Sequence, residues 1–198
     1  MPLILETIVT TRSAEGRLHL VPFGLIREDD GATVLAPFRP SPTIQNLAVN
    51  PVFAVSSPRD VRVIAGAVTG RRDWPVLPCA RIDGARLADS FGHAEFEVEA
   101  VEDDATRPRY RGRLVHEAAH APFLGYNRAQ GAVLEAAILS TRLHMLEPEK
   151  ILSEMRYLAI AVSKTAGPRE REAWNWIEDK VAAAIGPGAR VLDKPGAA

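Results

Sequence analysis

The period of the hydrophobic pattern changes near residue 122, and this change constrains the fold more than any other feature. From Leu3 to about Val115 the chain consists of short runs rich in β-branched and aromatic residues, separated by turn residues at near-regular spacing. Such a pattern is typical of an antiparallel barrel or sandwich. After Pro122 apolar residues recur every three or four positions, which predicts helices. We therefore expect a β-barrel with a helical C-terminal addition.

Eight runs predict strands, at residues 4–10, 17–26, 33–36, 53–56, 61–69, 79–84, 93–101 and 110–115. The turn sequences 13–16 and 28–31 separate the first three. In the seventh run an apolar set alternates with a largely acidic one: Ala94, Phe96, Val98 and Ala100 against Glu95, Glu97, Glu99 and Val101. We expect the first set to be buried and the glutamates to face solvent.

Three helices are expected after the barrel. The first covers about residues 128–146 and is apolar nearly all round, the second begins at Pro148 and stops before Gly167-Pro168, and the third ends at Gly186-Pro187. The domain limits that follow are 1–122 for the barrel, 123–186 for a helical region packed on it, and 187–198 for a flexible tail.

Composition bounds the function. The chain has 198 residues, 46% of them apolar and 25% charged, which is typical of a globular protein. A net charge of −1 favours neither nucleic acid nor an anionic membrane as partner, so an anion site would have to be local. Residues 1–6 lack the basic start of a signal peptide, and no run of eighteen apolar residues predicts a membrane span. We expect a cytoplasmic protein.

Cys79 is the only cysteine, which excludes an internal disulfide and fits a reducing compartment. No histidine lies close to it in the sequence, so we expect a buried small side chain and not a nucleophile. The phosphate-binding patterns of P-loop and Rossmann proteins are both missing.

His116-Glu117-Ala118-Ala119-His120 matches the pattern in which two histidines on one helix face bind zinc and the glutamate acts as general base. That chemistry needs a continuous helix and a third ligand. Here the preceding residues predict a strand and Pro122 follows closely. We expect a surface turn with two solvated imidazoles, and no metal.

Ser41-Pro42 predicts the start of a short helix, because serine is a favoured N-cap and proline a favoured first helical residue. The free N–H groups and positive dipole of such a helix attract anions, above all phosphate. Arg39 and Thr43 could complete the site. An ordinary capped turn with a surface arginine explains the same spacing. Pro22-Phe23-Gly24, inside the second strand, indicates an edge, a bulge or a close approach of backbone to a ligand.

The order of these features resembles the FMN-binding split-barrel (flavin reductase-like) superfamily, and in particular its DUF447 family. The resemblance covers about residues 3–165. It is carried by Pro22-Phe23-Gly24, the hairpin through Asp30-Gly31, the segment 36–47 and the strand 53–56, and later by residues 125–129, Glu135 and Thr141-Arg142-Leu143. The segment 116–120 has no counterpart in the family pattern.

The resemblance implies a split β-barrel of the FMN-binding type, FMN as cofactor, and a homodimer with flavin near the subunit interface. Carried over residue by residue, it implies a phosphate site, an isoalloxazine site and two further contacts to the ribityl chain or ring edge. The phosphate site would consist of Ser41, Thr43, Asn46 and Arg39. The isoalloxazine site would consist of Pro22, Phe23 and Gly24, and the two further contacts would come from Ser56 and Asp60.

The resulting hypothesis is a flavin-dependent oxidoreductase or reductase of a small molecule, with a nicotinamide, a deazaflavin or a reduced pterin as electron donor. A flavin carries out the redox chemistry itself, so we expect no catalytic triad. A non-catalytic flavin- or nucleotide-binding or scaffold protein is the alternative, followed by a zinc-dependent hydrolase that uses the segment 116–120.

Overall fold

The computed structural model describes residues 2–186, 188 and 190–192, so the expected tail at 187–198 falls mostly outside the described residues. The chain forms two compact units. One consists of the residues up to Arg59 together with Asp73–Phe123, and the other of Asp60–Arg72 together with the chain from Leu124 onward. A stretch that we assigned to the barrel, residues 60–72, therefore belongs to the helical unit.

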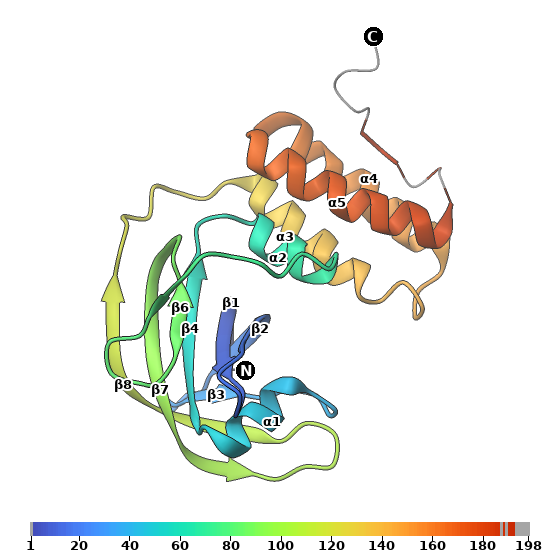
Figure 1. Ribbon diagram of the computed structural model, residues 1–198. Helices are drawn as coiled ribbons and strands as arrows, with labels where there is room; N and C mark the ends of the chain where they lie inside the picture. Colours follow the sequence, from blue (N-terminus) through green and yellow to red (C-terminus); the bar gives the residue numbers. More distant parts are fainter. Residues whose placement is uncertain (1, 187, 189, 193–198) are drawn as a thin grey trace. The chain divides into compact units, whose positions relative to one another are not determined.

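The first unit is a closed antiparallel barrel, with strand order β1-β2-β3-β8-β7-β4 (Figure 1). The six strands are β1 (Leu3–Arg12), β2 (Leu18–Arg27), β3 (Thr33–Leu35), β4 (Val52–Pro58), β7 (Ser90–Glu102) and β8 (Arg109–Ala119). The expected turns at 13–16 and 28–31 are confirmed. Gly16 and Gly31 close them at φ of 80° and 84°, a backbone region that favours glycine.

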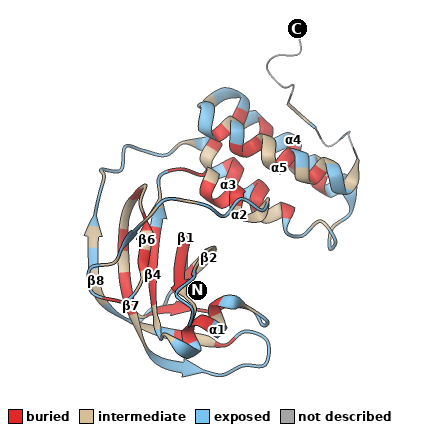
Figure 2. Ribbon diagram, viewed as in Figure 1, coloured by how far each residue is buried: buried red, intermediate tan, exposed pale blue. Residues whose placement is uncertain are grey.

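The barrel is filled by inward side chains from strands far apart in sequence. Phe53 and Phe96 stack at its centre, with ring centroids 5.0 Å apart. The helix expected after Ser41 is α1 (Pro42–Val49), and it adds Leu47 to this core. The core residues are Val9, Leu25, Leu35, Leu47, Phe53, Val55, Phe96 and Tyr110. Figure 2 shows buried residues gathered along β1 and β4.

The prediction of a strand at 79–84 is wrong. Two short strands, β5 (Val76–Pro78) and β6 (Ala85–Leu87), pair with each other, and residues 79–84 connect them. Three backbone N–H groups of this connection donate to a side chain instead of to a neighbouring strand. Ala80, Arg81 and Ile82 donate to the carboxylate of Glu95, at 2.6, 2.7 and 3.1 Å. Glu95 is therefore fully buried, contrary to the expectation that it faces solvent.

The strand expected at 61–69 is also wrong, because these residues form helix α2 (Arg62–Val68) in the second unit. Asp60 Oδ1 accepts the N–H of Arg62 at 2.9 Å and so starts the helical turn. Val63, Ile64 and Ala65 are buried, and α2 packs against α5 and α3. Tertiary packing thus overrides the β-propensity of the valines and isoleucine.

The other helices of the second unit are α3 (Arg128–Ser140), α4 (Pro148–Thr165) and α5 (Pro168–Ile185). Helix α3 ends six residues before the expected position. The hydroxyls of Ser140 and Thr141 donate to the carbonyls of Ala137 and Ile138 in its last turn. None of the helices in the described part of the chain combines the length and apolar composition that a membrane span requires.

Candidate functional site

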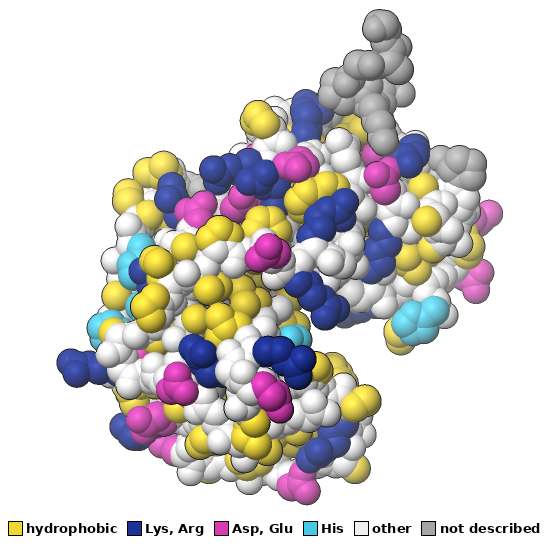
Figure 3. All heavy atoms as spheres, in the orientation of Figure 1, with side chains coloured by type: hydrophobic (Ala, Val, Ile, Leu, Met, Phe, Trp, Pro, Cys, Tyr) yellow, Lys and Arg dark blue, Asp and Glu magenta, His cyan; other side chains and the backbone are white. Residues whose placement is uncertain are grey.

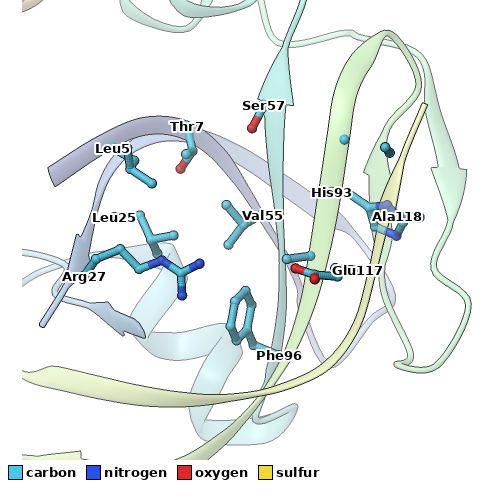
Figure 4. A pocket seen from close by; sticks show the side chains of 13 residues that line it. Leu5, Thr7, Leu25, Arg27, Val55, Ser57, His93, Phe96, Glu117 and Ala118 are labelled. Atoms are coloured by element: carbon cyan, nitrogen blue, oxygen red, sulfur yellow. The ribbon is translucent and has the colours of Figure 1, made fainter. Parts of the chain in front are cut away.

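The barrel contains a cavity of about 500 Å³, lined by residues of β1, β2, β4, β7 and β8. Figure 4 shows Leu25, Val55 and Phe96 forming its apolar wall. Figure 3 shows hydrophobic side chains at the bottom of the hollow and cationic ones at its rim. Ligand cavities in proteins have this size and this mixture of an apolar wall with a few polar groups.

The cavity lining also includes polar groups from several strands. Arg27 reaches inward from the end of β2, and its guanidinium donates to Thr33 Oγ1 at 2.5 Å. Thr7 and Ser57 line the cavity as well, and the Thr7 hydroxyl donates to the carbonyl of Phe23 at 3.1 Å. Glu117 adds a carboxylate from β8.

Pro22, Phe23 and Gly24 lie in the middle of β2, opposite Glu6–Ile8 of β1, and the pairing continues through them without a bulge. Phe23 packs against the barrel core. The room left by Gly24 is taken by β1, since a Cβ there would lie 2.9 Å from Ile4 Cγ2. The close approach that the sequence indicated is thus made, in this structure, by a protein side chain.

The start of α1 has the expected cap: Ser41 Oγ accepts the N–H of Thr43 at 3.2 Å, and Pro42 is the first helical residue. The next two N–H groups, of Ile44 and Gln45, donate to the Ser41 carbonyl at 3.1 and 3.3 Å. The amides of the first turn thus have partners within the chain. The hydroxyl protons of Ser41 and Thr43 are what this turn offers an anion.

The other residues of the expected phosphate site are Thr43, Asn46 and Arg39, and each has a different environment. Thr43 is fully buried, and its Oγ1 has no hydrogen-bond partner among the described residues. Asn46 is buried and donates to Thr11 Oγ1 at 2.9 Å, which ties α1 to β1. Arg39 turns to the loop before β8, where it contacts the Asp103 carboxylate at 2.7 Å and the Asp104 carbonyl at 3.0 Å.

Ser56 and Asp60 already have partners. Ser56 is fully buried, and its hydroxyl accepts the N–H of Leu87 at 3.1 Å. Asp60 lies in the helical unit, where it pairs with Arg62 at 2.7 Å and Arg169 at 3.6 Å. The Ser56 hydroxyl and the Asp60 carboxylate thus already have partners within the chain.

The segment 116–120 is not a turn. Its first four residues belong to β8, and His116 is half-buried while His120 is exposed. A strand cannot present histidines as the zinc-peptidase helix does, so that interpretation is wrong. Both histidines lie beside His93 of β7, whose Nε2 is 3.0 Å from Glu95 Oε1.

Glu95 is charged although it is buried. Burial alone would raise the pKa of Glu95, but the N–H of Ala80, His93 and the N–H groups of Arg81 and Ile82 together hold it below its usual value. The same negative charge acts on Cys79. Burial first, and then Glu95, raise the pKa of Cys79 to about 12, so its thiol stays protonated at neutral pH.

Sequence reasoning missed Arg27 and Ser57 as cavity residues. A signal was available for Arg27, because Phe23, Leu25 and Arg27 alternate along one strand and share its inward face. A charged residue at the end of a row of inward-facing apolar residues indicates a polar group in a cavity.

The fold is similar to that of solved flavoproteins. An FMN-bound protein from Methanosarcina mazei, described under DUF447, matches with a TM-score of 0.74 at 19% identity, over 89% of this chain and 94% of its own. Flavoredoxin from Methanosarcina acetivorans matches with a TM-score of 0.51 at 13% identity, over 63% and 72%. An FMN-binding protein from Thermus thermophilus with bound p-hydroxybenzaldehyde matches with 0.51 at 15%, over 64% and 77%. The expected split-barrel fold with C-terminal helices is confirmed.

Two family models match the sequence. No protein with a curated description matches it. Residues 5–121 match the N-terminal domain of DUF447, a family described as proteins of unknown function, and residues 127–179 match the second DUF447 model. Since these matches span both the barrel and the helices, the chain belongs to the DUF447 family.

Proposed function

We propose that this protein binds FMN through its barrel unit and uses it in the oxidation or reduction of a small molecule. The observation that carries the proposal is the likeness of 89% of the chain to an FMN-bound protein described under the same family. The cavity of about 500 Å³ supports it, because it has the size and lining of a cofactor site.

One property of the Ser41–Thr43 turn supports a flavin phosphate there. A buried hydroxyl without a partner is costly, and Thr43 Oγ1 is such a hydroxyl. Ser41 beside it has a hydroxyl proton to donate, since its oxygen is used only as an acceptor for the Thr43 amide. In the proposal the hydroxyls of Ser41 and Thr43 donate to the same phosphate.

Arg39 supplies the positive charge in this proposal. Its ion pair with Asp103 is exposed, and such pairs contribute little stability, so the guanidinium can turn to a phosphate at low cost. Asn46 would orient the turn from its bond to Thr11. The proposal places the ring along β2, beside Pro22, Phe23 and Gly24 and against the cavity residue Leu25 that follows them. It does not need Ser56 or Asp60, which already have partners.

FMN, when bound, supplies the electron-transfer chemistry. The protein then has to hold the ring, exclude water and leave room for the donor. The apolar wall made by Leu25, Val55 and Phe96 suits the first two tasks. We further propose a homodimer with the flavin near its interface, supported by the exposed apolar side chains Leu3, Ile4 and Leu5 at the start of β1.

The phosphate assignment is tested by titrating the flavin-free protein with FMN and comparing Thr43→Val with Thr10→Val. Both substitutions remove a buried hydroxyl that has no partner in the described part of the chain. We expect Thr43→Val to weaken FMN binding by about 1–3 kcal/mol, the range for removing a donor to a charged group. Thr10→Val should leave the affinity unchanged, and equal affinities for the two variants would contradict the assignment.

Activity is a separate question from binding. Steady consumption of a reduced nicotinamide, deazaflavin or pterin by the FMN-loaded protein would identify the electron donor. A protein that holds FMN and oxidises none of these donors would be a flavin carrier instead of an oxidoreductase.

A further inference from the structure

Three histidines gather on β7 and β8, where His93 is buried at the edge of the cavity lining. In the sheet His93 pairs with Ala118, while Glu95 pairs with His116. His120 follows directly after β8. Figure 4 shows the His93 side chain beside Ala118 and pointing away from the cavity wall formed by Phe96. Because Ala118 is small, the imidazoles on either side of it can approach His93.

Glu95 fixes the hydrogen on His93. Its carboxylate accepts from the N–H groups of Ala80, Arg81 and Ile82, and His93 Nε2 lies 3.0 Å from it. An ionised carboxylate only accepts, so Nε2 must carry the hydrogen. The lone pair of His93 is therefore on Nδ1, at the other side of the ring. A histidine held by a carboxylate in this way is the usual arrangement behind a metal ligand.

The lone pair of His93 faces another ring nitrogen. His93 Nδ1 lies 2.9 Å from His120 Nε2. The ring of His116 stands edge-on, with its centroid 5.6 Å from that of His93. Ligand atoms of His93, Glu95 and His116 all lie within 4.8 Å of one another. His93 is thus the shared neighbour of both other imidazoles, His120 at its Nδ1 and His116 at its ring edge. Figure 3 shows histidine side chains at the surface over β8.

We propose that His93, His116 and His120 bind one divalent transition-metal ion, with Nδ1 of His93 and Nε2 of His120 as two of the ligand atoms. Imidazole ligands favour Zn²⁺, Ni²⁺ and Cu²⁺ over Mg²⁺ and Ca²⁺. Zinc lies 2.0–2.1 Å from its nitrogen ligands, so two ligands of a tetrahedral ion are about 3.3 Å apart. The distance between these two nitrogens would have to increase by a few tenths of an ångström from its present 2.9 Å to admit the ion. Solvent can supply a fourth ligand.

The charges around the cluster partly balance. Glu95 brings one negative charge next to His93. Arg86 lies close enough to act electrostatically on His120. Arg86 would repel the ion, so Arg86→Gln should tighten binding.

This site is not that of a zinc peptidase. Glu117 lies between His116 and His120 on a strand, and it lines the cavity on the opposite face. The glutamate therefore cannot serve as a base for a metal held by the histidines. The proposed role is a structural or regulatory ion on the wall of the barrel.

Calorimetric titration of the untagged, metal-stripped protein with Zn²⁺ tests the proposal, and Co²⁺ gives an independent absorption spectrum. We expect one equivalent to bind, and His116→Asn and His120→Asn each to weaken binding at least tenfold. Both positions are at least partly exposed, so these variants should fold. His144→Asn, at an exposed histidine of the helical unit, is the matched control and should bind like the unaltered protein.

Thermal unfolding gives a second measurement on the same proteins. An ion that binds only the folded chain raises the Tm, and this rise should occur for the unaltered protein and His144→Asn but be lost in His120→Asn. Failure to bind one equivalent, or equal affinities for the cluster variants and the control, would overturn the proposal. In that case the contact between His93 and His120 is a hydrogen bond between two imidazoles and nothing more.

Discussion

At the scale of single residues, Glu95 joins three parts of the barrel unit. It lies on β7, carries a full negative charge in the interior, and anchors the connection between β5 and β6 through three N–H groups. It also orients His93. A buried carboxylate is tolerated only when its oxygens are fully hydrogen-bonded, and here four donors satisfy them.

Glu95→Gln should lower the free energy of unfolding at pH 7 by about 1.5–3 kcal/mol, because an amide cannot accept from all of these donors. The pKa of Glu95 is depressed in the folded state, so its stabilisation is present above the unfolded value near 4.3 and is lost as the pH falls through the folded value. We therefore expect the difference between variant and unaltered protein to shrink in acid. Denaturant unfolding at several pH values measures it.

Glu97→Gln is the control for this experiment. Glu97 lies on the same strand but pairs with Arg113 at the surface, where ion pairs contribute little. If Glu97→Gln costs as much stability as Glu95→Gln, or if the cost of Glu95→Gln does not depend on pH, the anchoring role is refuted.

At the scale of elements, β8 can pack closely against the barrel core because one of its residues, Gly112, has no side chain. Gly112 lies on β8 directly over the stacked pair of Phe53 and Phe96, and a Cβ there would be 2.7 Å from Phe53 Cζ and 3.1 Å from Phe96 Cδ1. The two rings can be stacked at the centre of the barrel only because this strand passes them without a side chain.

Gly112→Ala should therefore destabilise the protein by about 1–3 kcal/mol, the usual cost of overpacking a core. Gly131→Ala is the matched substitution in α3, where nothing lies within 4 Å of the added atom. It should raise stability by up to about 1 kcal/mol, because alanine favours helix. Denaturant midpoints compare the two, and a change of the same sign in both would contradict the packing argument.

At the scale of the whole molecule, the chain passes between its two units three times, after Arg59, after Arg72 and after Phe123. Helix α2 belongs to the helical unit, although strands of the barrel unit precede and follow it in the sequence. Its side chains Val63 and Ile64 are buried, and α2 packs against α3 and α5, which follow residue 124.

A chain that ends at Phe123 should therefore expose the apolar face of α2 and associate. Size-exclusion chromatography and binding of a hydrophobic dye measure this. The same shortened chain with Val63→Ser and Ile64→Ser should bind less dye and elute later. A shortened chain that binds no dye would show that α2 does not need the later helices.

The sequence alone determined the features that depend on near neighbours. The turn glycines, the cap formed by Ser41 and Pro42, and the change of period near residue 122 each follow from local conformational preference or side-chain alternation. The resemblance to DUF447, carried by segments such as 36–47, pointed to the family and to FMN, which the comparisons support.

Only the tertiary structure decided which distant residues meet. Residues 61–69 become a helix because of what packs on them, and Glu95 is buried because a segment 13–15 residues before it wraps around its carboxylate. His93 and His120, 27 residues apart, come together through the register of β7 and β8. The local sequence pattern indicates the conformation of a segment. Strand register and packing determine which partners each side chain has, and those partners decide its burial, charge and chemistry.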